Sequence, residues 1–577
     1  MKKTFDKISA KKLLSLLLAA MLSAGACSCD FFPQENSLSD SVNSSVDSGK
    51  DDSSDDSSSD EKPEEEGPNY TLDSYDFTTV FTDGASKTLR RYNPEVPSEN
   101  GSAVYDVYSN IGNKNYLKLD LTTDVDLVGY INYYNNADKS VTHSEKFFVE
   151  ANSTQFITFL DAFRAGAYGA FEKTITTISF QNVDATKEGK LTFVSAGICD
   201  RKIVTDEYMY VSDGSTVVGT SAFYGGCITH LEKLEQDVVE YMDSDGNIRI
   251  DRDIDPDSVP RVSSTSVNMV NIMDLGREIQ PSYYSGVKKA NGYDPQYDPD
   301  DVYDGLTGNE PVYNPIQCGD YGGHSPQIID YNYQSDRLYI KMKAQEWFFG
   351  CNIQANGYIE VTYYFDENGS LMVDNRYTDF SQFINEYDVP MHMQETPATY
   401  IVYPFNYFYC ETKQGTIFDE KVGEQNGRTQ SKHTANQAVT GDYIYDIKAK
   451  NLKNGWCAFV NENKFGVGIY MPNADKYVAS RGRKSVNYFS EKGNSRYYEE
   501  FFQFGEDELV PSYAVFNYSY INPSLNRRMI QFVPLEYTYA LFIGDTEEMG
   551  DAFDGLKKKG VTNAHLADEE TRGWPDY

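Results

Sequence analysis

The sequence lacks the short motifs that identify several classes of enzyme. It has no C-x-x-C pair and no H-x-H pair, so local spacing gives no sign of a zinc site. It also has no Gly-rich phosphate loop and no G-x-S-x-G nucleophile elbow. Only 6 histidines occur in 577 residues, which makes each of them a scarce candidate for proton transfer. These absences disfavour zinc, nucleotide and serine-hydrolase chemistry.

Long hydrophobic runs are absent as well. No segment reaches the roughly 18 apolar residues that a membrane-spanning helix needs. The N-terminus instead has 5 lysines within residues 2–12, followed by a short, mostly apolar run over 13–26. A basic stretch, a short apolar stretch and small residues at its end are typical of a secretory signal peptide. We therefore expect the protein to be exported.

A cysteine directly follows this apolar run. Residues 1–29 resemble the signal peptide and lipobox of bacterial lipoproteins, because Cys27 comes after Ala24-Gly25-Ala26. The lipoprotein pattern usually has leucine where this chain has Ala24. The resemblance implies lipidation at Cys27 and a protein anchored to the cell membrane by its lipid, facing outward. Cys29 is the alternative lipid site, and a simple cleaved signal peptide is the alternative reading.

Basic residues are few relative to acidic ones. The chain has 51 Lys and Arg against 88 Asp and Glu, a net charge of −37. Nucleic-acid binding requires a basic surface, so nucleic acid is excluded as a partner. Part of the excess lies in the segment 30–68, which from residue 37 onward is nearly all Ser, Asp, Glu, Asn, Gly and Pro. Such a composition cannot bury enough apolar surface to fold, so we expect a disordered acidic linker there.

Helical patterns are scarce in the remaining residues, and strand patterns are common. The best helix candidates are 154–169 and 546–559, whereas apolar and polar residues alternate over 116–121, 337–343 and 358–365. Hairpin turns are expected at 243–247 and 366–369. The sequence therefore predicts a mainly β protein, with a small N-terminal β-sandwich over 69–203 and a large antiparallel β-domain over 204–577.

The N-terminal sandwich is similar in its architecture to an accessory carbohydrate-binding module. The aromatic residues that could stack on sugar rings in it are Tyr130, Tyr133, Tyr134 and Phe147. Packing inside the sandwich is the alternative role of these four side chains.

The larger domain carries a succession of motifs at residues 225–231, 271–284, 314–320, 394–400, 456–458 and 466–470. Taken together, these motifs resemble a poorly characterised group of secreted bacterial proteins with a galactose-mutarotase-like β-supersandwich. The resemblance covers roughly 300 residues. It implies a large antiparallel supersandwich that acts on carbohydrate at a concave sheet face. It does not assign a reaction, because a fold hosts many functions.

Polar and aromatic residues gather in the motif at 271–284. Asp274, Glu278 and Gln280 would share one face of a strand, with Arg277 on the other. Carboxylates, amides and flat rings suit sugar hydroxyls. We predict Asp274 as a catalytic candidate and these residues as candidates for substrate binding: Arg277, Gln280, Tyr283 and Tyr284.

Glu395 is the main candidate for acid or base catalysis. It precedes an apolar strand, and a carboxylate at the start of a strand beside a cleft suits proton transfer. In mutarotase-like proteins a glutamate has the role of base, and the resemblance implies that role for Glu395. Asp320 and His324 lie on a Gly-rich loop and are further catalytic candidates. His230 and Gln317 are candidates for substrate binding. We expect seven of the candidates to converge on one concave face of the larger domain: Asp274, Arg277, Gln280, Gln317, Asp320, His324 and Glu395.

Metals and disulfides are weakly indicated. The sequence predicts no required cofactor, although oxygen ligands for Ca²⁺ are available at Asp298, Asp300, Asp301 and Asp304. Six cysteines follow residue 29, at positions 199, 227, 318, 351, 410 and 457. An exported protein permits disulfides, but we expect buried free thiols, and the sequence cannot choose a pairing.

Three classes of function stay open. The first is an enzyme acting on extracellular glycans or oligosaccharides, with hydrolysis by paired carboxylates favoured over elimination or epimerisation. The second is a non-catalytic glycan-binding surface lipoprotein, and the third is a structural or adhesion protein. We favour the enzyme because the candidate residues are chemically richer than binding alone requires.

Overall fold

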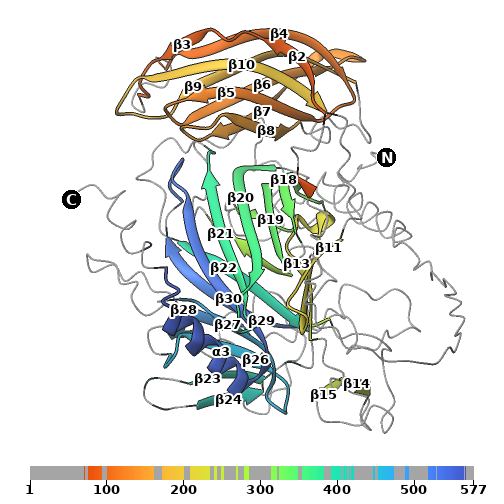
Figure 1. Cartoon of the computed structure of the whole chain (residues 1–577), viewed down its shortest axis with the longest axis vertical. Helices are drawn as coiled ribbons and strands as arrows, with labels where there is room; N and C mark the ends of the chain where they lie inside the picture. The colour runs from red at the N-terminus through yellow and green to blue at the C-terminus, as the bar shows by residue number, and fades with distance from the viewer. Residues whose placement is uncertain are drawn as a thin grey trace, which may run out of the picture. The chain divides into compact units, whose positions relative to one another are not determined.

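The described residues form antiparallel β-sheets, and the helix α3 (Thr546–Lys559) lies near the C-terminal end of the described part of the chain (Figure 1). The computed structural model describes residues 70–71, 76–93, 100–160, 172–199, 208–233, 239–242, 248–251, 268–270, 278–284, 314–320, 324–334, 336–347, 354–381, 392–402, 405, 407–411, 413, 415, 417–421, 446–448, 452–472, 488–492, 518–527, 529–563 and 566. The predicted signal peptide with Cys27 and Cys29, and the linker over 30–68, lie outside these residues. The prediction of a mainly β protein is confirmed.

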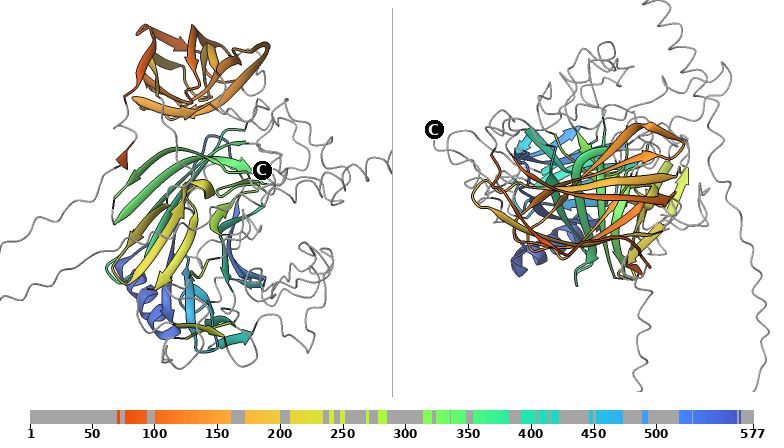
Figure 2. Two further views of the ribbon diagram at one scale, coloured as in Figure 1. Left: turned by 90° about the vertical axis from the view of Figure 1, so that its right-hand side faces the viewer. Right: turned by 90° about the horizontal axis from the view of Figure 1, so that it is seen from above.

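Two facing sheets form an N-terminal β-sandwich (Figure 2). One sheet has the order β4-β9-β6-β7, and the other has the order β2-β10-β5-β8, with β3 also paired to β10. Leu117, Leu119 and Leu121 alternate along β5 and are buried between the sheets. The strands are β2 (Thr78–Thr82), β3 (Ser86–Leu89), β4 (Ser102–Gly112), β5 (Tyr116–Thr123), β6 (Leu127–Asn135), β7 (Asp138–Val149), β8 (Gln155–Phe159), β9 (Lys173–Asn182) and β10 (Gly189–Cys199).

The prediction of a helix over 154–169 is wrong for residues 155–159. Residues 155–159 form β8, which pairs antiparallel with β5. The segment Gln-Phe-Ile-Thr-Phe is rich in aromatic and β-branched residues, and these favour a pleated, half-buried strand over a helix. The predicted boundary near residue 203 falls between β10 and the next strand, outside the described residues.

A third sheet, of 19 strands, contains the rest of the described strands except one hairpin. Strand neighbours are mostly consecutive in the sequence, and every pairing is antiparallel. The short β14 (Val239–Met242) and β15 (Ile248–Asp251) pair only with each other. The strands of the large sheet are β1 (Tyr70–Thr71), β11 (Tyr208–Ser212), β12 (Thr216–Ser221), β13 (Ile228–Lys233), β16 (Ile279–Ser282), β17 (Pro315–Ile316), β18 (Gln327–Tyr333), β19 (Arg337–Glu346), β20 (Gln354–Phe365), β21 (Leu371–Asp379), β22 (His392–Val402), β23 (Tyr407–Glu411), β24 (Ile417–Lys421), β25 (Asp446–Lys448), β26 (Trp456–Val460), β27 (Phe465–Tyr470), β28 (Tyr488–Lys492), β29 (Tyr518–Arg527) and β30 (Leu535–Asp545).

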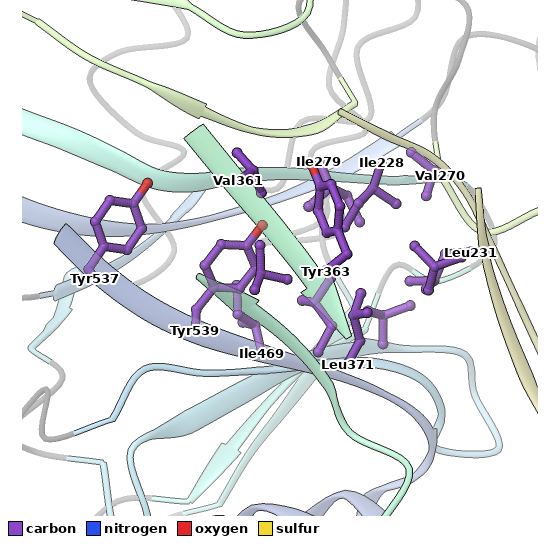
Figure 3. Close-up of a cluster of buried hydrophobic side chains, with 14 of the residues drawn as sticks. Ile228, Leu231, Val270, Ile279, Val361, Tyr363, Leu371, Ile469, Tyr537 and Tyr539 are labelled. Carbon is purple, nitrogen blue, oxygen red and sulfur yellow. The ribbon is translucent and has the colours of Figure 1, made fainter. Parts of the chain in front are cut away.

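The large sheet buries an extensive apolar core (Figure 3). Ile279 of β16, Tyr363 of β20 and Tyr537 of β30 are among its members, and each is at most 2% exposed. The predicted hairpin at 366–369 is confirmed, because Gly369 N donates to Asp366 O between β20 and β21. The other predicted turn, at 243–247, lies outside the described residues.

The helix expected over 546–559 is confirmed as α3 (Thr546–Lys559). Asp545 caps its N-terminus in a reciprocal capping box with Glu548, and Gly560 ends it in the left-handed region. Met549, Phe553 and Leu556 face one side and pack against Trp456 and Tyr470. No helix in the described part of the chain is long and apolar enough to cross a membrane.

Candidate functional site

A set of buried polar side chains lies on and around β16, β17, β19 and β22, and we call it the polar layer. These side chains are unusual because polar groups are costly to bury unless they are hydrogen-bonded. Each of them is at most 1% exposed. The members are Glu278, Gln280, Ser282, Asn314, Gln317, Asp320, Gln345, Glu346, Gln394 and Thr396.

Glu395 lies beside the polar layer, within β22 rather than before a strand as the sequence suggested. Its carboxylate is half-buried and accepts a hydrogen bond from the Tyr284 hydroxyl, with 3.2 Å between Oη and Oε2. Gln394 holds Tyr284 in position, since its side-chain amide bonds both the N–H (2.7 Å) and the C=O (2.9 Å) of that residue. Burial, and then the negative charge of Glu395, raise the pKa of Tyr284 well above its usual range. Tyr284 therefore stays protonated and donates to Glu395.

Asp320 and His324 form a second pair. Asp320 is fully buried, and its Oδ1 accepts from the backbone N–H of His324 (2.9 Å) and lies 2.9 Å from Nδ1 of the same residue. Gln345 Nε2 also donates to Asp320, over 3.3 Å. With Asp320 accepting, Nδ1 carries the proton and Nε2 presents a lone pair. The His324 side chain is 39% exposed, so solvent or a ligand can reach its ring.

Glu346 is a carboxylate that the sequence reasoning missed. It is fully buried, and both of its oxygens accept from the backbone N–H of Asn314, over 3.1 and 3.0 Å. The Asn314 side chain in turn bonds Ser282 Oγ over 3.2 Å. The signal available in the sequence was the polar pair Gln345-Glu346 at the end of the alternating strand β19. In the structure every residue at this end of the strand is buried.

The side-chain amides of Gln280 and Gln317, both candidates for substrate binding, form hydrogen bonds to backbone groups. Gln280 Oε1 accepts from Cys318 N over 2.8 Å, and Gln317 Nε2 donates to Gly225 O over 3.2 Å. Their predicted part in substrate binding stays a prediction.

Two other candidates have hydrogen-bond partners outside the polar layer. Tyr283 is in the apolar core, where its hydroxyl lies 3.0 Å from that of Tyr537 and its ring stacks on Tyr377 with centroids 4.1 Å apart. His230 Nε2 on β13 lies 2.8 Å from Glu232 Oε2. The remaining candidates lie outside the described residues: Asp274, Arg277, Asp298, Asp300, Asp301 and Asp304.

Two buried thiols meet the polar layer. Cys227, in the turn before β13, and Cys318, just after β17, are both fully buried beside Glu278. Burial raises the pKa of the Cys227 thiol to about 11. Burial also raises the pKa of Cys318, followed by the effects of Cys227 and Glu278. These thiols are therefore protonated near neutral pH in the absence of a bound cation.

Asp379, at the end of β21, is a buried carboxyl with an unusual pKa. It is 1% exposed and accepts from Ser381 N (3.2 Å) and Ser381 Oγ (2.9 Å). Burial raises its pKa from 3.8 to about 7, against the smaller opposing effects of these bonds and of Lys146. A carboxyl that changes charge near neutral pH is a candidate for proton transfer.

The raised pKa of Asp379 predicts a pH-dependent stability. The folded state holds this proton more tightly than the unfolded state. The stability that the proton contributes to the fold is therefore complete below about pH 4 and is lost as pH rises toward 7. At about 1.4 kcal/mol per pKa unit, we expect the free energy of unfolding to fall by about 2.5 kcal/mol between pH 5 and pH 8 as Asp379 loses its proton. In Asp379→Asn this fall should be absent. Urea unfolding of both proteins at the two pH values measures it, and equal falls in both would contradict the assignment.

No protein-family model matches the chain, and no curated protein matches it either.

Proposed function

We propose that the protein is an exported, lipid-anchored protein that acts on extracellular glycans, and that Glu395 is its acid/base carboxylate. The observation that carries this proposal is the hydrogen bond from Tyr284 to the half-buried Glu395 at the edge of the polar layer. A positioned, partly buried carboxylate that solvent still reaches can transfer a proton to or from a sugar oxygen. The resemblance to mutarotase-like proteins supports the same role, and the sequence of residues 1–29 supports export and lipidation at Cys27.

His324, oriented by Asp320, is the second group of the proposed site. Strand registers support the pairing: Glu395 is opposite Ser282, Ser282 is opposite Ile316, and Ile316 is opposite Gln345, the donor to Asp320. Neighbouring strands are about 4.8 Å apart, so the Glu395 and Gln345 backbones are roughly 14 Å apart. Opposite residues of neighbouring strands project from the same face of a sheet, so Glu395 and Gln345 share a face, and this separation leaves room for a sugar between them.

Hydrolysis is the reaction we favour over elimination. A lyase needs a base that loses its proton readily, and the pKa values of Tyr283 and Tyr284 are both raised by burial. A tyrosine in this state donates a hydrogen bond instead of accepting a proton. Asp274 and Arg277, from the same motif, stay in the proposal as candidates for catalysis and substrate binding.

The test is a survey of soluble polysaccharides with three readouts. New reducing ends report hydrolysis, unsaturated ends that absorb ultraviolet light report elimination, and a faster approach to anomeric equilibrium reports epimerisation. The proposal expects reducing ends. A protein that binds glycans without any of the three products supports the non-catalytic alternative.

Half-exposed tyrosines on the N-terminal sandwich support the glycan-binding alternative. They also suit an accessory binding role for the sandwich beside catalysis. Tyr133 and Phe147 are core residues, at 2% and 0% exposure. Tyr130 and Tyr134 on β6 are half-exposed, as is Asn132 between them. Asn132 bonds Thr177 over 2.9 Å. Two rings with an amide and a hydroxyl between them suit the stacking and hydrogen bonding that sugars need.

We therefore expect the double substitution Tyr130→Ala/Tyr134→Ala to weaken glycan binding. Stacking of an aromatic ring contributes roughly 0.5–1.5 kcal/mol, so the loss of two rings should lower affinity about tenfold or more. Turnover of a short oligosaccharide should not change. Titration calorimetry of the purified full-length variant measures the affinity. The matched control is Tyr108→Ala, at an exposed tyrosine of β4. Unchanged affinity would remove the sandwich from glycan binding.

A further inference from the structure

The strongest cluster of metal-binding groups in the described residues consists of Cys227, Glu278 and Cys318. One ligand atom from each lies within 4.8 Å of the others, and all three residues are fully buried. Cys318 Sγ and Glu278 Oε2 are 2.7 Å apart. No other three His, Cys, Asp or Glu side chains come this close within the part of the chain that the structure describes.

The backbone holds these three residues firmly. Cys227 N donates to Tyr224 O over 3.1 Å, Cys318 N donates to Gln280 Oε1 over 2.8 Å, and Glu278 O accepts from Tyr400 N over 3.3 Å. The turn before Cys227 is tightly packed as well. Gly225 and Gly226 both have positive φ, and a side chain at Gly225 would place its Cβ 2.4 Å from Gln317 O. The cluster is therefore preorganised from three distant segments.

Gln280 supplies an independent observation. Its side chain is fully buried, and its Nε2 has no hydrogen-bond partner among the described residues, while its Oε1 is bonded to Cys318. An unsatisfied buried N–H is costly. A thiolate produced by metal binding at Cys318 would give this donor an acceptor, because N–H groups around metal-bound ligands commonly tune them in this way.

We propose that Cys227, Cys318 and Glu278 bind one Zn²⁺ ion within the polar layer. Soft sulfur ligands select zinc over calcium and magnesium, and a carboxylate completes a donor set that zinc accepts. Zn–S bonds of about 2.3 Å and Zn–O bonds of about 2.1 Å put tetrahedral ligands roughly 3.5–3.8 Å apart. The cluster fits if Cys318 and Glu278 move apart by roughly 1 Å. A water molecule would take the fourth position.

The carboxylate distinguishes this site from a disulfide. A bond between Cys227 and Cys318 would remove the S–H group that Cys318 offers to Glu278. Zinc instead brings positive charge to the carboxylate and to both sulfurs. This inference does not depend on the proposed glycan activity, since the ion would hold together β13, β16 and β17 whatever the substrate.

The experiment uses the purified full-length chain, stripped with a chelator under reducing conditions. We expect it to bind one Zn²⁺ per chain, and Co²⁺ in its place should give the intense thiolate-to-cobalt charge-transfer absorption. Loss of a second-shell group typically costs 10–100-fold in metal affinity, so loss of a ligand in Cys318→Ser should cost at least about a hundredfold. Glu278→Gln should also weaken binding without removing the thiolate absorption.

A second pair of buried cysteines provides the matched control. Tyr409 is opposite Ala458 across β23 and β26, which puts Cys410 opposite Cys457 in the same register. The variant Cys410→Ser/Cys457→Ser should bind Zn²⁺ like the wild type. Three outcomes would overturn the proposal. These are a wild type without stoichiometric zinc or the cobalt absorption, equal metal loss in the control, or peptide mapping that finds Cys227 and Cys318 joined as a disulfide. The first and third need only the wild-type protein.

Discussion

Replacing Glu395 with glutamine should lower glycan turnover at least about a hundredfold while glycan affinity changes little. The amide keeps the size of the side chain and can still accept from Tyr284, but it cannot transfer a proton. A general acid or base contributes typically 10²–10⁴-fold to a rate, and the expected loss is the lower end of that range. Steady-state turnover on the best substrate from the polysaccharide survey, with affinity from calorimetry, measures both quantities.

Glu411→Gln is the matched control for this experiment. Glu411 is a carboxylate of the same large sheet, on β23, where it forms a surface ion pair with Lys453 at 2.7 Å. Turnover in this variant should equal that of the wild type. If Glu395→Gln also turns over normally, Glu395 is a structural residue, and the proton-transfer role passes to Asp320 with His324 or to Asp274.

Replacing Lys343 with methionine should destabilise the protein by about 3–5 kcal/mol. Lys343 on β19 and Glu145 on β7 form an ion pair, and their side chains are only 2% and 1% exposed. Lys343 Nζ also donates to Lys146 O over 3.0 Å. Removing the ammonium leaves the Glu145 carboxylate buried without this partner, and that desolvation penalty is the reason for the large effect. Denaturant unfolding and thermal melting measure the loss.

The double variant Glu145→Gln/Lys343→Met tests this cause. It removes both charges, so its stability should recover most of the loss, whereas a loss due to packing alone would persist. Lys453→Met, at the exposed pair with Glu411, is the control and should leave the stability close to that of the wild type. Because β7 belongs to the sandwich and β19 to the large sheet, Lys343→Met should also increase proteolysis between them. A single variant as stable as the wild type would contradict the ion pair.

Local patterns in the sequence were enough for the fold class and for individual elements. Alternation over 116–121 and 337–343 identified strands β5 and β19, since side chains of a strand point to opposite faces. The α3 helix could also be predicted from the sequence, because its cap and its apolar face lie within a few helical turns. The same logic failed at β8, where five residues were too few to distinguish a strand from a helix before their pairing with β5 was known.

The candidate site could be predicted only in part. Asp320 and His324 are four residues apart, so one loop brings them together and the sequence already suggested the pair. Glu395 and Tyr284 were both named as candidates, but their hydrogen bond depends on the register of β16 with β22, across more than a hundred residues. Glu346 was missed because its role comes from Asn314 on a separate segment.

The sequence by itself determined a mainly β chain, its acidic charge and the chemical types of its candidate residues. Those properties follow from composition and from patterns with periods of 2 and 3.6 residues, which act over short distances along the chain. Only the tertiary structure decided that Cys227, Glu278 and Cys318 meet, and that Tyr283 faces the core while Tyr284 faces Glu395. The physical reason is strand register, because a shift of one residue reverses the face of every side chain, and nonlocal pairing sets that register.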